Sequence, residues 1–267
     1  MLTDITIGQY FPGNSLIHRL DPRMKLVFLL LLITAIFIVN TPMAYSLICL
    51  FTLVTLLLSN VPIMMVIKSI KPLWWIIIFT VLIHIFTTPG EAIAKVWIFS
   101  ITKEGIQQAA LMSVRLILLI VLSSLLTFTT SPITLTDALE KLLTPFKRIG
   151  LPAHELAMMM TIALRFIPTL LEETERIMKA QEARGADFSS GSIVKRVKGM
   201  IPLLVPLFIS AFRRADDLAV AMEARCYRGG ENRTRMKVLC ITSVDYKAGI
   251  VMTVFLIGLF MMKIYGL

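Results

Sequence analysis

The sequence predicts an all-α integral membrane protein, with about five transmembrane helices and a helical cytoplasmic domain inserted before the last of them. Apolar residues make up 57% of the 267 positions, which is more than a soluble globular protein carries. The chain has five apolar runs, several of which reach roughly 20 residues when their tolerant flanks are included, as a membrane-crossing helix requires. Most of the charged residues fall between the fourth and the fifth run. These observations favour a multi-pass membrane protein with one polar domain.

The apolar runs set the expected domain boundaries. No small-residue cleavage site follows the first run, so we expect a retained span and not a removed signal peptide. The expected domains are an N-terminal segment with four spans at 1–130, a cytoplasmic domain at 131–245, and the last span within 246–267. The five runs lie at residues 26–39, 43–58, 73–86, 111–128 and 248–262.

The charge distribution predicts the orientation in the cell membrane. If residues 1–25, 60–72 and 130–247 are cytoplasmic, they hold 23 of the 27 lysines and arginines, as the positive-inside rule requires. We therefore expect a cytoplasmic N-terminus and a cytoplasmic inserted domain. The net charge of +10 does not indicate nucleic-acid binding, because no basic stretch is interleaved with aromatic residues. The three cysteines lack metal-type spacing and predict neither a disulfide framework nor a zinc site.

The inserted domain begins with a short helix and a long one. Residues 131–247 carry 18 of the 27 basic and 13 of the 17 acidic side chains. A capped helix is expected at 134–147 and a long helix at 153–184, which Pro168 should kink because proline removes a backbone donor. Gly185 is the expected C-terminal cap, and a turn should follow at 187–192.

A second long helix is expected from residue 193 to about 225. It has a basic start, an apolar middle and a charged end, like the helix before it. The apolar middle at 200–212 contains Pro202 and Pro206 and is too short to cross a bilayer. This part is therefore expected to be buried in protein or to lie at the membrane face.

The two long helices end in nearly the same five letters. Ala-Gln-Glu-Ala-Arg ends at Arg184, and Ala-Met-Glu-Ala-Arg ends at Arg225, 41 positions later. The simpler interpretation is helix termination, since a cation suits the negative end of the helix dipole. The alternative is that the helix ends bind a partner. Small alanines permit close approach, and the planar arginine side chain can meet a carboxylate or carbonyl groups.

No enzyme motif accompanies these helices. The sequence has no phosphate-binding P-loop, no Gly-x-Ser-x-Gly and no His-Glu-x-x-His, so a non-catalytic protein without cofactor or metal is expected. His84 and Arg115 fall inside spans, where ionisable groups are often functional. A structural role is expected for both, because His84 lies near a helix end and Arg115 can snorkel or pair within the bundle. Neither is assigned to a site.

The chain resembles a known family, the transmembrane T component of energy-coupling factor (ECF) transporters. These transporters import vitamins and metal ions. The paired arginine motifs carry one part of the resemblance. The order of spans and cytoplasmic helices agrees over essentially the whole chain. The other part is an N-terminal stretch similar to the family's Ser-x-x-His-x-Leu-Asp-Pro-Arg-x-Lys-Leu pattern, which here reads Ser15-Leu16-Ile17-His18-Arg19-Leu20-Asp21-Pro22-Arg23-Met24-Lys25-Leu26.

The resemblance implies a coupling role. Each arginine motif of the family docks in one of two ATP-binding-cassette ATPases, and a separate membrane S component binds the substrate. The apolar parts of the long helices, with Met158-Met159-Met160, would hold that S component, although ordinary core packing explains these methionines equally well. Shared use for vitamin uptake is expected. Where Ala-Arg-Gly is the family's motif, Cys226 replaces the glycine, which leaves the end of the second helix open. The implied ATPase-coupling residues are Ala183, Arg184, Gly185, Ala224, Arg225 and Cys226.

Two other functions remain open at the level of sequence. A conventional ABC permease subunit also presents a cytoplasmic coupling helix, although it usually offers one coupling loop per subunit. A membrane enzyme acting on a lipid phosphate would use arginines to hold the phosphate and carboxylates to bind magnesium. Its candidate residues are Arg184, Arg225 and Arg228, with Asp216-Asp217 or Glu172, Glu173 and Glu175.

Overall fold

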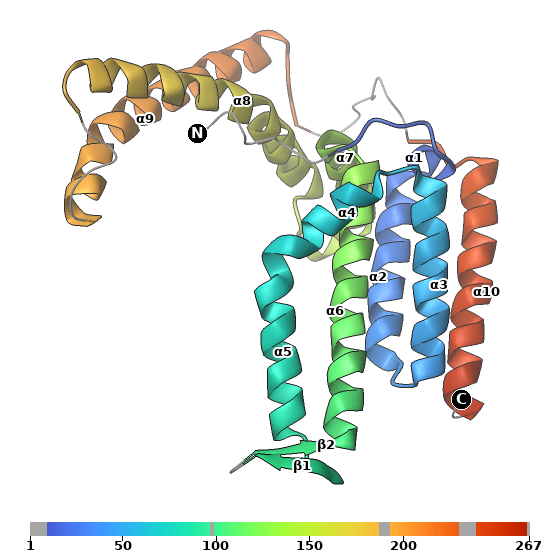
Figure 1. Cartoon of the computed structure of the whole chain (residues 1–267). Coiled ribbons are helices and arrows are strands. Elements are labelled where there is room, and N and C mark those ends of the chain that lie inside the picture. The colour runs from blue at the N-terminus through green and yellow to red at the C-terminus, as the bar shows by residue number, and fades with distance from the viewer. Residues whose placement is uncertain (1–9, 97–98, 187–192, 230–238, 266–267) are drawn as a thin grey trace. The chain divides into compact units, whose positions relative to one another are not determined.

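The structure, a computed structural model, describes residues 10–96, 99–186, 193–229 and 239–265 and divides into two compact units (Figure 1). The bundle unit comprises Gly8–Ala138 and Leu239–Leu267. The paired-helix unit contains Leu139–Val238, together with Met1–Ile7. Nearly all of the described chain is helical, as predicted.

The bundle unit is a set of apolar helices around a shared core. In Figure 1, α2, α3, α6 and α10 run side by side, and α5 lies beside α6. Leucine, isoleucine and methionine side chains from these four helices form the core, including Ile36, Ile48, Leu122 and Leu259. The elements are α1 (Leu16–Arg19), α2 (Pro22–Ile38), α3 (Pro42–Ser59), α4 (Ile63–Ile70), η1 (Lys71–Leu73), α5 (Trp74–Thr87), α6 (Lys103–Thr129) and α10 (Ser243–Tyr265).

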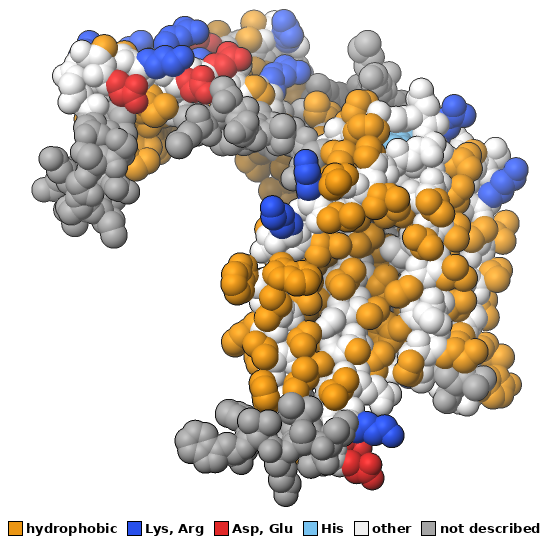
Figure 2. All heavy atoms as spheres, viewed as in Figure 1, with side chains coloured by type: hydrophobic (Ala, Val, Ile, Leu, Met, Phe, Trp, Pro, Cys, Tyr) orange, Lys and Arg blue, Asp and Glu red, His pale blue; other side chains and the backbone are white. Residues whose placement is uncertain are grey.

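The outside of the bundle unit is apolar as well. Figure 2 shows hydrophobic side chains over its visible face. Leu53, Phe79 and Val254 are each more than half exposed, although a water-soluble protein would bury most such side chains. A helix that is hydrophobic all round suits a membrane span. The bundle unit therefore has the surface expected of a protein in lipid.

Five helices of the described chain are long and apolar enough to cross a membrane, which matches the predicted number but not every member. The five are α3, Ile63–Thr87, α6, α8 (Ala153–Ala183) and α10. The first predicted span, 26–39, forms α2, whose 17 residues leave it just below this length. Because α2 rises about 26 Å and packs in the bundle core, it still suits a bilayer. Only the first half of α8 is apolar; its second half contains charges from Glu172 to Glu182.

One element of the bundle unit was not predicted. Between α5 and α6 the chain forms an antiparallel hairpin of β1 (Ala92–Val96) and β2 (Phe99–Thr102). Thr102 then caps α6, because its hydroxyl oxygen accepts a hydrogen bond from the Gly105 N–H at 3.0 Å. This two-stranded hairpin is the exception to an otherwise all-α fold in the described residues.

Arg115 pairs inside the bundle unit, which is one of the roles expected for it. Its Nε donates to the Tyr45 hydroxyl at 2.7 Å, and Nη2 donates to the Asn40 side chain at 3.2 Å. The guanidinium carbon also lies 5.6 Å from the centre of the Phe37 ring. These contacts tie α6 to the α2–α3 connection.

The helices of the inserted domain follow the predicted order. The short helix is α7 (Pro132–Leu143), which starts where Ser131 accepts a hydrogen bond from the Thr134 N–H and continues as η2 (Thr144–Ile149). The long helices are α8 (Ala153–Ala183) and α9 (Ile193–Ala224), within one residue of expectation. Pro168 lies inside α8; the kink expected there stays a prediction. The turn expected at 187–192 lies outside the described residues.

Candidate functional site

The first tip, Ala183-Arg184-Gly185, is a helix end with a defined geometry. Gly185 has φ +87°, a left-handed conformation that glycine adopts without a steric penalty. Its N–H donates to the Glu182 carbonyl at 2.9 Å, and the Ala186 N–H donates to the Gln181 carbonyl at 3.0 Å. This pair of bonds is a Schellman motif. Gly185 is therefore the predicted C-terminal cap, and Arg184 occupies the last position before it.

The second tip, Ala224-Arg225-Cys226, has the same geometry without a glycine. Cys226 has φ +57°, and its N–H donates to the Glu223 carbonyl at 2.8 Å. The Tyr227 N–H donates to the Met222 carbonyl at 3.0 Å. These are the two bonds of the first tip, moved by 41 positions. The sequence left the end of this helix open; the structure ends α9 at Ala224, with Cys226 in the left-handed position.

The shared cap places both arginines alike. Arg184 and Arg225 each stand directly before the left-handed residue, and both side chains are exposed. Among the described residues, neither guanidinium forms an ion pair. The repeated sequence thus forms the same backbone structure at the end of both helices. Helix termination explains the cap, but it leaves both arginine side chains available to a partner.

A polar network holds the second tip. The Tyr227 hydroxyl lies 3.4 Å from Nε2 of His154, and Nδ1 of His154 lies 3.0 Å from a Glu140 carboxylate oxygen. His154 belongs to the first turn of α8, so these contacts connect the end of α9 to the start of α8. Farther along the pair, Arg214 of α9 donates to the Glu173 carboxylate of α8. The two long helices are therefore tied together at two levels.

A pocket of about 530 Å³ adjoins the second tip. One wall comes from the first half of α8, and the other comes from the end of α9 and the residues after it. Sequence reasoning did not identify it, because residues 60 positions apart meet only when α8 and α9 pack together. The lining residues are Met158, Thr161, Ile162, Arg165, Leu218, Met222, Arg225, Cys226, Tyr227, Arg228 and Gly229.

Both long helices also expose apolar side chains, at the positions predicted for a partner. Met159 of α8 is 55% exposed and Phe208 of α9 is 64% exposed, so packing against the described residues explains neither. Met158, in contrast, is half-buried and lines the pocket. The exposed apolar surface is defined by Leu156, Met159, Met160 and Ile167 on α8 and by Met200, Ile201, Leu204, Val205, Phe208, Ile209 and Phe212 on α9.

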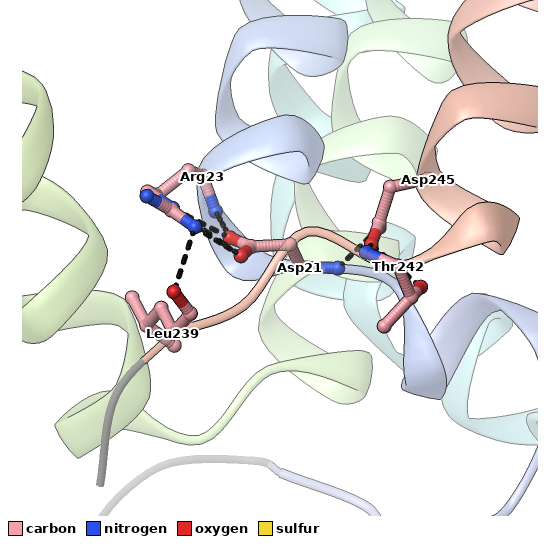
Figure 3. Close-up of polar contacts among 5 residues, drawn as sticks. All are labelled: Asp21, Arg23, Leu239, Thr242 and Asp245. Carbon is pink, nitrogen blue, oxygen red and sulfur yellow. Dashed lines mark hydrogen bonds and ion pairs between the residues drawn. The ribbon is translucent and has the colours of Figure 1, made fainter.

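The N-terminal motif builds a buried network in the bundle unit (Figure 3). The Asp21 N–H donates to Oδ1 of Asp245 at 2.7 Å, which joins the start of α2 to the first turn of α10. The other oxygen of Asp245 accepts from the Thr242 N–H and hydroxyl. Asp21 caps α2 and accepts a bidentate pair from Arg23, whose Nη2 also donates to the Leu239 carbonyl. The network joins segments more than 200 positions apart.

Arg23 keeps the Asp21 carboxylate ionised. Burial by itself would raise the pKa of Asp21, but the hydrogen bonds and the charge of Arg23 outweigh it and hold the pKa below the ordinary value of 3.8. The salt bridge spans 2.7 Å. Its carboxylate is charged at neutral pH.

His18 and Lys25 complete the motif. Nε2 of His18 lies 2.9 Å from the Phe11 carbonyl, so this nitrogen carries a proton and donates; the Ser15 hydroxyl lies 2.7 Å from Nδ1. Buried Lys25 donates to the Thr129 carbonyl at 2.9 Å, at the C-terminal end of α6, where a cation is favoured. The motif is thus a structural joint between α2, α6 and α10.

The candidate residues of a lipid-phosphate enzyme are only partly brought together. Arg225 and Arg228 line the same pocket, whereas Arg184 caps the other helix. Glu173 is engaged by Arg214, and neither Asp216 nor Asp217 lines the pocket. No group of three histidine, cysteine or acidic residues that could hold a metal occurs in the described part of the chain.

The apolar helix bundle and the paired helices with exposed arginine tips define a multi-pass membrane subunit. Residues 13–236 match the CbiQ family, described as "Cobalt transport protein". The chain is 60% identical to the energy-coupling factor transporter transmembrane protein EcfT of Acidaminococcus fermentans, over 94% of each chain. It is 50% identical to the EcfT protein of Bacillus subtilis, over 92% of this chain and 93% of that protein. The chain therefore belongs to this family of ECF transporter transmembrane components, as the N-terminal motif and the arginine repeat predicted.

Proposed function

We propose that this chain is the coupling subunit of an ECF importer. It transmits the motion of two ATP-binding-cassette ATPases to a membrane S component that binds a vitamin or another micronutrient. The ATPases hydrolyse ATP, and this chain is not catalytic. The bundle unit lies in the cell membrane, and the N-terminus and the paired-helix unit face the cytoplasm, in keeping with the 23 basic residues assigned to that side.

The observation that carries this proposal is the identical cap of the two tips. Two helices of one chain end in the same backbone geometry, with an exposed arginine at the same place in each. A chain with two equivalent docking elements suits two ATPases, whereas a conventional permease subunit usually offers one. Arginine pairs with carboxylates through bidentate hydrogen bonds that are stronger than neutral ones. Ala183, Arg184, Gly185, Ala224, Arg225 and Cys226 are the proposed ATPase-coupling residues.

The same two helices link the tips to the proposed S component. The exposed apolar surface of α8 and α9 lies on the helices that carry the tips, so a movement of a tip displaces the surface behind it. The ion pair between Arg214 and Glu173 links the two helices. Coupling requires an element that can adopt two arrangements. Two long helices that are held by the ATPases at their tips can supply such an element. Methionines at positions 159 and 160 offer adaptable packing, which suits several S components.

Purification of the tagged chain from its native membrane in mild detergent tests the proposal. The unmodified chain should retain two ATPases and at least one small hydrophobic protein. Arg184→Ala and Arg225→Ala should each weaken ATPase retention about tenfold, since a hydrogen-bonded charge pair contributes about 1.5 to 3 kcal/mol. Uptake of substrate in reconstituted vesicles should fall accordingly.

Arg213→Ala is the matched control, because Arg213 is an exposed arginine of α9 outside both tips. It should retain the ATPases fully. The coupling role is refuted if the double variant at Arg184 and Arg225 assembles and transports normally. Capture of one ATPase by each of two copies of this chain would instead support a conventional permease.

A further inference from the structure

The pocket beside the second tip has a basic lining. We propose that it is an anion-binding site, and that its occupant is an acidic side chain of the ATPase that docks at the second tip. The inference rests on the coupling function proposed above and adds a receptor site to it. None of the residues of the first tip lines this pocket.

Three arginines line the pocket. Arg165 comes from α8, Arg225 from the second tip, and Arg228 from the residues that follow it. Among the described lining residues there is no aspartate or glutamate. None of the three guanidiniums makes an ion pair within the described part of the chain, although Arg214 nearby on α9 is paired with Glu173. Three like charges around one cavity favour an anion between them.

The remaining walls select the kind of anion. Met158, Ile162, Leu218 and Met222 give the pocket an apolar side. A free inorganic anion would leave that side in contact with water, whereas an acidic residue with apolar neighbours on a protein surface covers both kinds of wall. The volume of about 530 Å³ also exceeds what one small anion fills. The chemistry therefore indicates a carboxylate carried on a partly apolar protein segment.

The position of the pocket indicates which protein supplies that segment. Arg225 belongs both to the second tip and to the pocket wall, so a partner seated on the tip also meets the pocket. Tyr227 fixes the wall through His154. The two tips thus share a cap, but of the two only the second lines this pocket, which would allow the chain to distinguish its two ATPases.

Cys226 provides a direct probe of occupancy, since it is exposed and lines the pocket. Cys49→Ser and Cys240→Ser leave it as the only cysteine of the chain. The assembled complex and the full chain alone are then treated with a water-soluble maleimide. Labelling of Cys226 should be slower in the complex. Arg165→Gln and Arg228→Gln should each return the labelling rate toward that of the chain alone and weaken ATPase binding about tenfold.

Arg213→Gln is the matched control and should label as the unmodified complex does, since Arg213 does not line the pocket. Equal protection of Cys226 in the Arg165→Gln and Arg228→Gln complexes would overturn the proposal and leave the coupling function intact. Failure of the unmodified chain to bind ATPases would overturn both. Vesicles of phosphatidylglycerol that protect Cys226 without ATPases, where phosphatidylcholine vesicles do not, would show a lipid occupant and also overturn it.

Discussion

A single residue, Cys226, separates the two otherwise equivalent helix ends. At φ +57° its Cβ lies close to backbone atoms, a conformation that costs a non-glycine residue about 1 to 2 kcal/mol. Gly185 at φ +87° avoids that cost. The chain nevertheless folds both ends alike, because the Schellman hydrogen bonds offset the strain at the second tip.

We therefore expect Cys226→Gly to stabilise the second tip by about 1 kcal/mol, since glycine has no Cβ to strain. Amide hydrogen exchange of the Tyr227 N–H, which closes the cap, should slow about fivefold. Gly185→Ala should have the opposite effect on the Ala186 N–H at the first tip. Cys226→Ala retains a Cβ and serves as the control. Equal exchange in the Gly and Ala variants at position 226 would show that the backbone there is not strained.

Sequence reasoning found the arginines but not their surroundings. The register of Ala-x-Glu-Ala-Arg predicted equivalent helix ends, and comparison of Cys226 with Gly185 would have indicated the left-handed position as well. Arg165 and Tyr227 gave no local signal, and Arg228 was named only as a candidate phosphate ligand of the alternative enzyme. Arg165 lies 60 positions before Arg225, and only the packing of α8 on α9 brings both to one pocket.

At the scale of elements, the joint between α2 and α10 depends on one buried carboxylate. Asp245 accepts hydrogen bonds from the Asp21 N–H and from two donors of Thr242, at 2.7 to 2.8 Å. It is fully buried, and its bond to the Asp21 N–H is buried as well, so water cannot replace that bond if the carboxylate is lost.

Asp245→Ala should therefore destabilise the chain by about 2 to 4 kcal/mol, through unsatisfied donors and a lost helix cap. The readout is the thermal unfolding midpoint of the detergent-purified chain, with Asp217→Ala as the exposed acidic control. An unfolding midpoint for Asp245→Ala equal to that of the control would mean that the network of Figure 3 does not hold α2 to α10.

The spans were predictable because length and apolar composition are local properties. The order of α7, α8 and α9 followed from caps, prolines and helical spacing, which are local too. The β1–β2 hairpin was not predicted, because strands of five and four residues are too short to show a clear alternation of apolar and polar residues. The hydrogen bond between Asp21 and Asp245 joins residues 224 positions apart, and no pattern within either segment predicts it.

At the scale of the whole molecule, the proposed role divides α8 and α9 into two working parts. In that proposed role their tips would meet the ATPases, and their exposed apolar surface would meet the S component. Each part can then be disabled without the other. A protein that merely anchored its partners would not need both parts on the same rigid helices.

Phe208→Lys tests this division. Phe208 lies on the apolar middle of α9 with 64% of its surface exposed, so a lysine there places a charge in the proposed S-component contact without disturbing the core. We expect capture of the S component to fall at least tenfold and substrate uptake to be lost, while ATPase retention stays normal. Ile149→Lys is the control, because Ile149 is 82% exposed and lies in η2, outside α8 and α9.

Quantitative co-purification of all three partner types measures both contacts in one experiment. Loss of the ATPases together with the S component would mean that α8 and α9 form one undivided interface. Retention of every partner with normal uptake would refute a contact at this surface. Loss of the S component with normal ATPase retention would mean that the two contacts lie on different parts of the same helices. In the proposed complex the long helices join these contacts, so they would carry the ATPase motion to the substrate-binding partner.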